Sequence, residues 1–475
     1  MIVLLKFLCY NEIIKLHSEF LMKKIILLSS LVFVSLHAQT LKNSVQEVLS
    51  SNPTILESLQ NYKSTQNDIK LAKSAYYPTL DLKLGIGFEN TRRTNQTLSS
   101  SNQSFNYDVY QSSLTYAQNL FDGFATTYQI KEQEYKNLSA AYSYIEKVNN
   151  TSFELVNTYI ELMKNKELLG TAKENVVIDK EIFSKVNKLY DAGLTTLSEV
   201  NKIESSLALA ESNLVVQENT LLDSSFNLER VLGKELNPDE MTKPLIKITL
   251  PKTREEALQF AINNNPSLLV SEYNIRLAQS TIKTKQSSYY PQLDVEISQA
   301  MNKNLSASAG NDDRFRAMAY LSFNLFRGFA DSTSIQKSRT QVTQEIEGKN
   351  NIKRQILQGL NLSWTANEKL EEQLKYLIQY KDFSFQTLTL YSKEYDLGRR
   401  SLLDLLSAQN DFIKAKAQII ATQYNLLYAK YRILDAMGLL VQTVMEDTSV
   451  GYADVNLASV TLDEETIQED SIQNN

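Results

Sequence analysis

The side chains best suited to nucleophilic or metal-binding chemistry are almost absent from this sequence. Its 475 residues include one cysteine, Cys9, and two histidines, His17 and His37. All three lie within the first 38 residues, a segment that we expect to be removed during export. The remaining chain could then not form Cys/His zinc sites, Ser-His-Asp triads, thiol nucleophiles or disulfides. Carboxylates are plentiful, but no motif places a catalytic pair, so we expect no enzyme, no cofactor and no metal site.

The N-terminal segment has the pattern of a secretory signal peptide. Two lysines follow Met22, an apolar run covers residues 25–36, and Ala38 is a plausible last residue before cleavage. Residues 1–21 resemble an upstream extension of the reading frame. A transmembrane helix is the competing interpretation, but the apolar run is too short for one.

The charge of the chain argues against nucleic acid as a partner. The formal net charge is −6 over the whole sequence. Without residues 1–38, which carry four Lys and two acidic residues, 45 basic and 53 acidic residues remain, a balance of about −8. Proteins that bind nucleic acid typically present a basic surface instead.

Polar side chains that could form directional ion pairs recur in two similar segments, "YDAGLTTLSEVN" and "YDLGRRSLLDLL". These segments belong to a repeat that runs through the chain. Two motif pairs lie 213 residues apart, and the later motif pairs lie 205 apart. The pairs are Asn52-Pro53 with Asn265-Pro266, Tyr76-Tyr77-Pro78 with Tyr289-Tyr290-Pro291, "NLFDGF" at 119–124 with "NLFRGF" at 324–329, and "YDAG" at 190–193 with "YDLG" at 395–398. The change in offset lies between the proline and the NLF motif, so only the strand-loop part has changed length.

Each copy predicts the same order of elements: a helix, two strands, a long helix and a return helix. The expected helices are 53–76, 124–190, 196–232, 266–288, 329–395 and 401–437, and the expected strands are 79–90, 105–121, 292–302 and 314–326. The fold class is therefore mainly α with β. The predicted organisation is 1–38 for the extension and signal peptide, 39–237 for the first repeat, 238–262 for a linker, 263–440 for the second repeat and 441–475 for an acidic tail without helical periodicity, partly disordered.

The spacing of apolar residues predicts what these elements contact. On the return helices, apolar residues follow a heptad-like spacing that is typical of coiled coils, and a coiled-coil scaffold would explain that spacing. They are Val200, Ile203, Leu207, Ala210 and Leu214, with Leu405, Ala408, Phe412, Ala415 and Ile419 at the equivalent positions. At about 1.5 Å per residue, a long helix would reach roughly 100 Å, which favours a tube or rod.

The strands favour a membrane barrel. Apolar and polar residues alternate along the strands. In the first strand of each hairpin, the alternation starts directly after Pro78 or Pro291, which ends the preceding helix. Strands of about ten residues with one apolar face fit a transmembrane β-barrel. Four strands cannot close one, so the chain must assemble around an axis, and a channel favours three chains or more. The tyrosines before each proline fit an interfacial aromatic belt and burial at the joint equally well.

The duplicated motifs, together with "LLDLLSAQNDF", resemble the TolC family of outer-membrane efflux proteins over residues 40–440. The resemblance implies a homotrimer with a twelve-stranded barrel in outer-membrane lipid and a helical periplasmic tunnel. Residues 238–262 and the C-terminal segment would form a belt around that tunnel. It also implies a passive exit duct that docks through a periplasmic adaptor onto an inner-membrane pump of RND, ABC or MFS type, in efflux or type I secretion. A secreted coiled-coil scaffold or adhesin without a barrel is the alternative.

The resemblance also implies roles for the hairpin tips. Asp404 matches an acidic ring of the pore, whereas the family's second ring falls on Ser407. Arg400 and Tyr395 match residues that hold neighbouring coiled coils closed, with Ser198 and Glu199 as partners. Gly193 and Gly398 match the tips where adaptors dock. On the residues alone, a solvated helix end with dipole pairs explains these charges as well.

Overall fold

The computed structural model describes residues 39–94, 102–244, 250–305, 309–447, 449–450 and 455. The predicted signal peptide and the last twenty residues of the predicted tail lie outside these ranges. Residues 95–101, between the first two strands, also lie outside these ranges. Side chains of residues 92–94 and 102–105 are not described either.

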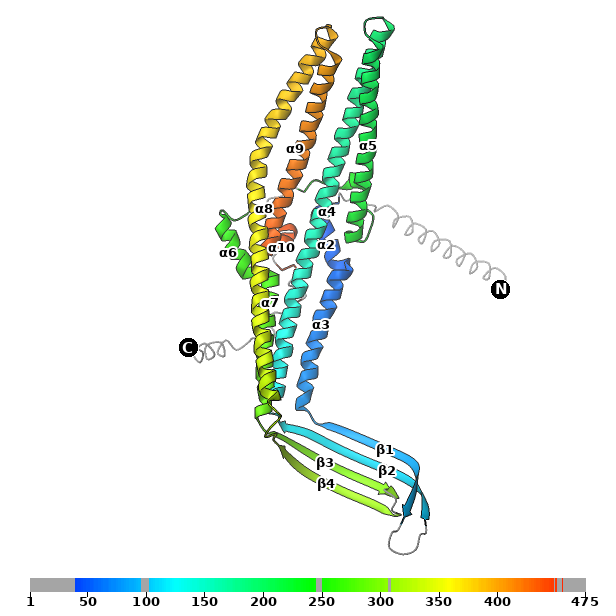
Figure 1. Ribbon diagram of the computed structural model, residues 1–475, viewed down its shortest axis with the longest axis vertical. Helices are drawn as coiled ribbons and strands as arrows, with labels where there is room; N and C mark the ends of the chain where they lie inside the picture. Colours follow the sequence, from blue (N-terminus) through cyan, green and yellow to red (C-terminus); the bar gives the residue numbers. More distant parts are fainter. Residues whose placement is uncertain are drawn as a thin grey trace, which may run out of the picture.

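The described chain is elongated, with two helical hairpins at one end and a sheet at the other (Figure 1). The larger helices are α2 (Leu41–Ser51), α3 (Pro53–Lys73), α4 (Ala125–Asp191), α5 (Leu197–Leu232), α6 (Arg254–Asn264), α7 (Pro266–Gln286), α8 (Ala330–Asp396), α9 (Leu402–Ala436) and α10 (Leu440–Met445). Short 3-10 turns cover Ser74–Tyr76, Pro238–Glu240 and Ser287–Tyr289, and the strands are β1 (Thr79–Thr94), β2 (Asn102–Phe121), β3 (Gln292–Lys303) and β4 (Asn311–Ser322). The predicted order of each repeat is confirmed.

Side-chain caps fix the starts of several helices. Thr40 accepts a hydrogen bond from the backbone N–H of Asn43 at α2, and Thr253 and Ser401 do the same at α6 and α9. Such caps satisfy N–H groups that have no partner inside the helix. The two 67-residue helices, α4 and α8, instead begin after Phe124 and Phe329, which both adopt the left-handed conformation, with φ of 68° and 66°. The same unusual turn therefore leads from the sheet into the helices in both repeats.

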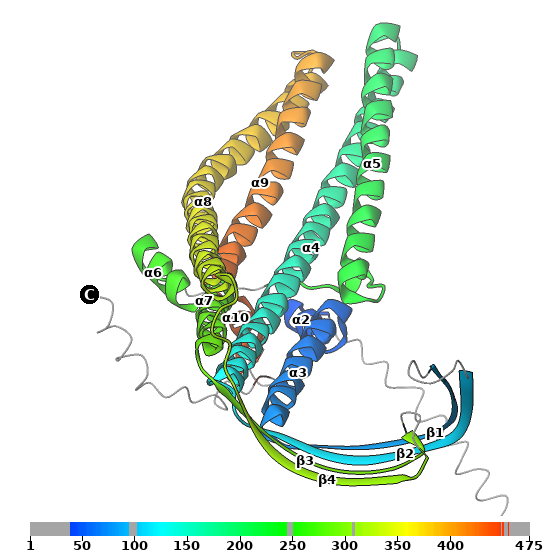
Figure 2. The same ribbon diagram turned by 60° about the horizontal axis from the view of Figure 1, so that its bottom comes forward.

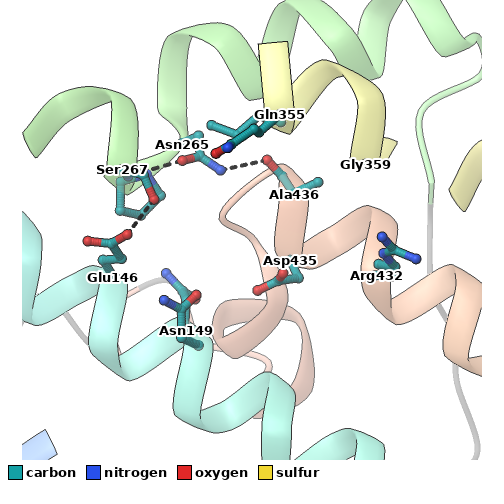
Figure 3. A pocket seen from close by; sticks show the side chains of 12 residues that line it. Glu146, Asn149, Asn265, Ser267, Gln355, Gly359, Arg432, Asp435 and Ala436 are labelled. Carbon is teal, nitrogen blue, oxygen red and sulfur yellow. Dashed lines mark hydrogen bonds between the residues drawn. The ribbon is translucent and has the colours of Figure 1, made fainter. Parts of the chain in front are cut away.

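An asparagine joins two helices end to end in each repeat. Asn265 caps α7 by accepting from the N–H of Ser267 at 3.0 Å, and its own amide donates to the carbonyl oxygen of Ala436 in α9 at 2.9 Å (Figure 3). Pro266 fits the first helical position because it lacks an N–H. The motif at Asn52 repeats this arrangement. Each Asn-Pro pair therefore connects the start of α3 or α7 to the end of the return helix of the same repeat, α5 or α9.

The core lies between the helices. The largest cluster gathers around α4 at mid-length, where Leu155, Val156 and Tyr159 are fully buried, and a second cluster occupies the hairpin tips. The predicted seam of the return helices is confirmed. Ile203 and Ala415 are fully buried, and most of the other heptad positions are buried or half-buried.

The four strands form one antiparallel sheet in the order β1-β2-β3-β4, so β1 and β4 are its edges. The sheet extends from the helices as a single curved layer, and none of the described helices covers it (Figure 2). Its apolar residues are consequently exposed: Leu80, Leu82, Leu84, Ile86 and Phe88 on β1 are each 66–80% exposed. An apolar row of this length is rare on a protein surface in water and marks a contact with lipid or protein.

Four sequence expectations need correction. Strand β4 ends at Ser322 rather than 326, because its partner β3 begins at Gln292, opposite Ser322, and offers no residue beyond it. Part of the predicted tail forms α10, whose Leu440 and Val441 are buried in the core. Helices α2 and α6 were not predicted as helices of their own. Local caps and a few buried residues define these short elements, and periodicity over a short window does not reveal them.

Candidate gate at the hairpin tips

Gly193 and Gly398 turn the two hairpins in the same way. Both have a left-handed backbone, with φ of 70° and 69°. In the second tip, the N–H of Arg399 donates to the carbonyl oxygen of Glu394 at 2.9 Å, and that of Gly398 donates to Tyr395 at 2.9 Å. The first tip has the equivalent pair of bonds, which defines a Schellman motif in each. In both tips, the left-handed glycine therefore makes the turn between the two helices of the hairpin.

The structure brings Tyr395 and Glu199 together across the two hairpins. Tyr395 is 7% exposed and packs with apolar residues of α4, α5 and α9. Its hydroxyl is buried without a hydrogen-bond partner. Burial and the nearby Glu199 carboxylate raise the pKa of Tyr395 to about 12. Glu199 accepts a hydrogen bond from the Thr195 hydroxyl at 2.5 Å, whereas Ser198 is exposed at the surface.

Arg400 is held inside its own hairpin. Its Nε and Nη2 atoms lie 2.9 Å and 2.8 Å from Glu394 Oε2, and its guanidinium lies 4.1 Å from the centre of the Tyr391 ring. A charge-assisted contact combined with ring stacking fixes the orientation of a guanidinium. Within one chain, Arg400 therefore contacts neither Ser198 nor Glu199. The sequence analysis missed Glu394, although it lies only six residues before Arg400, across the turn.

Asp404 has a local role at the start of α9. Ser401 caps that helix by accepting from the backbone N–H of Asp404 at 3.2 Å, and its hydroxyl donates to Asp404 Oδ2 at 2.8 Å. The S-x-x-D spacing is the capping-box signature. Arg400 Nη1 lies 4.0 Å from the same carboxylate. Asp404 stays half-exposed and Ser407 is exposed, so both can face a space outside this chain.

Two further contacts between the hairpins were not predicted. Lys185 on α4 forms an ion pair with Asp396 at the end of α8. Deeper along the hairpins, Gln409 Nε2 on α9 donates to Asp179 Oδ1 on α4 at 2.6 Å. Single polar residues inside a helical seam give no sequence signal, because the period of the surrounding apolar residues dominates.

At the opposite end of the helices, Pro78 and Pro291 separate a 3-10 turn from a strand, as expected. The turn after β2 packs tightly against the second junction. A Cβ on Gly123 would lie 2.6 Å from the carbonyl oxygen of Ser287 and 2.8 Å from Tyr290 Cβ. The junction tyrosines are each 49–71% exposed in the chain, so burial within it does not explain them: Tyr76, Tyr77, Tyr289 and Tyr290.

Other kinds of site are not found in the described ranges. Nowhere in them do three or more His, Cys, Asp or Glu residues group in a way that could hold a metal ion. None of the helices in the described part of the chain is long and apolar enough to cross a membrane.

Long helical hairpins joined to a small, uncovered, apolar-faced sheet define the class of outer-membrane channel proteins with a periplasmic tunnel. The family model described as "Outer membrane efflux protein" matches residues 44–234 and 257–439, and the chain belongs to this family. The two matched segments follow the two repeats.

Individual relatives agree with this assignment. The chain is 20% identical to the outer membrane efflux protein BepC of Brucella suis, covering 84% of this chain and 86% of BepC. It is 22% identical to the outer membrane protein TolC of Escherichia coli, covering 85% and 83%. The crystal structure of the Campylobacter jejuni CmeC outer membrane channel superposes with a TM-score of 0.72 at 12% identity, covering 88% and 90%. The protein is therefore an outer-membrane efflux channel, and the mainly helical fold with four strands is that of such channels.

Proposed function

We propose that three copies of this chain form a closed channel that serves as a passive exit duct for efflux or type I secretion. The observation that carries this proposal is the uncovered apolar row on a sheet whose edge strands, β1 and β4, each have one free edge among the described strands. An open edge is not tolerated in lipid. Three chains of four strands give twelve, enough for an open lumen, whereas side chains fill a barrel of eight.

The internal repeat specifies how the copies meet. Because β4 repeats β2 and β1 repeats β3, the β2–β3 pairing should recur between β4 of one copy and β1 of the next. Tyr116 lies opposite Ile297 in β2–β3. The offsets of 205 and 213 convert this pair into Leu321 opposite Leu84. Both leucines belong to the apolar rows, so the derived register keeps apolar residues on one face of the barrel.

The same reasoning applies to the tunnel. Helices α5 and α8 lie on opposite sides of the chain in both ribbon views (Figures 1 and 2). Each carries exposed apolar residues: Leu209, Val215, Val216, Leu222 and Phe226 on α5, and Tyr376, Ile378, Phe383, Phe385 and Leu390 on α8. When two different faces of neighbouring copies meet head to tail, the copies close into a ring if the rotation between them permits it. We therefore place α8 of one copy against α5 of the next, as α4 lies against α9 within the chain.

The working cycle follows from this architecture. Barrel and tunnel give cargo a continuous path, and an adaptor and an inner-membrane pump supply selection and energy. The tips at Gly193 and Gly398 are the docking surface for the adaptor. The same tips carry the gate: Asp404 lines the constriction, and Tyr395, Glu199, Arg400 and Ser198 control the separation of the hairpins. Residues 238–262 and the C-terminal segment form a belt at mid-length, where Gln39 pairs with Met241.

Cysteine cross-linking tests the assembly. The double variant Leu84→Cys with Leu321→Cys should form disulfides between copies on oxidation, because residues directly opposite in a sheet have Cβ atoms about 5 Å apart. A covalent trimer should appear on a denaturing gel. The control pair, Leu84→Cys with Phe315→Cys, is six residues out of register and should stay monomeric. A protein that leaves the cell envelope without detergent, with no cross-link, would favour the scaffold or adhesin instead.

A further inference from the structure

Two buried polar side chains connect the hairpins well inside the tips. Asp179 on α4 and Gln409 on α9 are 2% and 1% exposed. Gln409 Nε2 donates to Asp179 Oδ1 at 2.6 Å and to Asn175 Oδ1 at 3.1 Å. The Ser206 hydroxyl on α5 lies 3.3 Å from Asp179 Oδ2. The cluster thus joins α4, α5 and α9, which belong to two different hairpins.

The position of the pair along the seam between α4 and α9 sets it apart. Toward the tips, the seam is apolar, with Ile182 and Val186 packed near Leu402 and Leu405. Toward mid-length, the polar contacts between α4 and α9 become partly exposed, as in the ion pair of Lys416 with Glu174. Asp179 and Gln409 are therefore the first polar pair behind the apolar section of the seam between α4 and α9, and both are fully buried.

The hydrogen-bonding groups of this layer are incompletely satisfied while the two hairpins are packed together. Gln409 Oε1 is buried and has no hydrogen-bond partner among the residues that the structure describes. Burial raises the pKa of Asp179 against the opposing effect of its hydrogen bonds from Gln409 and Ser206, so desolvation outweighs them. Buried polar groups lacking full hydrogen bonding destabilise the packed state, and hydration recovers that cost on separation. An apolar pair would gain nothing comparable from water.

We infer that Asp179 and Gln409 form an internal latch that fixes the register of the two hairpins and sets how readily they separate. A single buried polar layer in a coiled coil is known to specify register at a cost in stability. Opening that starts at the tips reaches this layer next, and water entering there compensates the lost contacts. The latch rests on the proposed channel function, but it involves residues other than the tip residues assigned to the gate.

Single-channel recording of the reconstituted full chain in a planar bilayer, with potassium chloride as the probe, tests the latch. Asp179→Leu with Gln409→Leu should stabilise the closed seam and lower the open fraction about tenfold or more, since apolar replacement of a buried polar pair is often stabilising. Asp179→Leu alone should raise the open fraction, because it deprives Gln409 of a hydrogen-bond acceptor. Asp179→Asn, which keeps the shape and an acceptor, should behave nearly as the unaltered protein.

A matched control lies within one hairpin. Asn165 and Ser224 are both 7% exposed and share a hydrogen bond of 2.5 Å between α4 and α5. Asn165→Leu with Ser224→Ala removes a buried polar pair without affecting the contact between hairpins, and should leave the open fraction unchanged. The latch is refuted if the Asp179 and Gln409 variants match this control. No current from the unaltered protein would instead count against the channel itself.

Discussion

The side-chain amide of Asn52 donates a hydrogen bond of 2.9 Å to the backbone carbonyl of Val231, 179 residues later in the chain. Asn52 also caps α3 by accepting from the N–H of Thr54 at 2.9 Å. One buried side chain therefore satisfies the start of one helix and the end of another. The Asn265–Ala436 pair repeats this contact. Each of the two joints between helices therefore depends on one asparagine.

We predict that Asn265→Ala destabilises the protein by about 2 kcal/mol, since it removes a cap and leaves the partly buried carbonyl of Ala436 without this partner. Thermal unfolding followed by circular dichroism measures the change. Asn264→Ala is the matched control, because its amide bonds only to Phe260 in the preceding turn and is exposed. Equal effects of the two substitutions would show that the joint contributes little.

Substitutions at the glycines of the two NLF motifs, Gly123 and Gly328, should affect folding and assembly separately. Gly123→Ala should impair folding, because the new Cβ would clash with the backbone of Ser287 in the same chain. Around Gly328, with φ of 59°, the chain leaves open space. In the proposed trimer, the repeat offset would place Ser74 and Tyr77 of the next copy there. We therefore predict that Gly328→Ala yields a folded chain that assembles poorly.

Helix content by circular dichroism and particle mass in mild detergent distinguish the two variants. Both substitutions carry a backbone penalty of about 1–2 kcal/mol for a left-handed alanine, so the difference between them reports the contacts. Normal trimers of Gly328→Ala would contradict the derived arrangement of copies.

At the tip, Arg400→Ser should raise single-channel conductance. The substitution removes both the Glu394 contact and the stacking on Tyr391, so the turn between α8 and α9 loses its main side-chain support. Arg399→Ser is the control, because Arg399 is adjacent, equally charged and exposed. If both variants conduct as the unaltered protein does, Arg400 has no part in the gate.

The repeat and the order of elements could be predicted because periodicity and duplicated motifs are properties of the sequence itself. The partner of Arg400 could not, because Glu394 and Glu199 are both acidic, and only the path of the turn places Glu394 beside the guanidinium. Asp179 and Gln409 were missed for a related reason. Their burial arises from the contact between two hairpins that are distant in sequence, and nothing local marks it.

The exposed position of Ser407 suggests a test of cation sensitivity. Three Asp404 side chains around one axis would form a single acidic ring, and Ser407→Asp would add a second, one turn along α9. Clustered carboxylates attract divalent cations. We expect millimolar magnesium to block the Ser407→Asp channel more strongly than the unaltered one in planar bilayers. Equal block in both channels would contradict the prediction.

Asp435 should make stability depend on pH. It lines a cavity of about 260 Å³ at the joint of α7 and α9, together with Glu146 and Arg432 (Figure 3). Burial raises the pKa of Asp435 from its usual 3.8 to about 7, against the opposing effect of Arg432. The folded state then holds a proton between about pH 4 and 7 that the unfolded state has lost. Stability should therefore fall as the pH rises through this range.

Between pH 5 and pH 8, the loss should reach at most about 3 kcal/mol per chain. Asp435→Asn should keep the shape and remove most of the dependence, because an amide does not titrate. The melting temperature of the protein in detergent at both pH values measures this loss, with Asp411→Asn as the control at an exposed site on the same helix. The contrary result is that the melting temperatures of the unaltered protein and of Asp435→Asn rise equally from pH 5 to pH 8. That result would mean that Asp435 is already ionised in the folded state at pH 5.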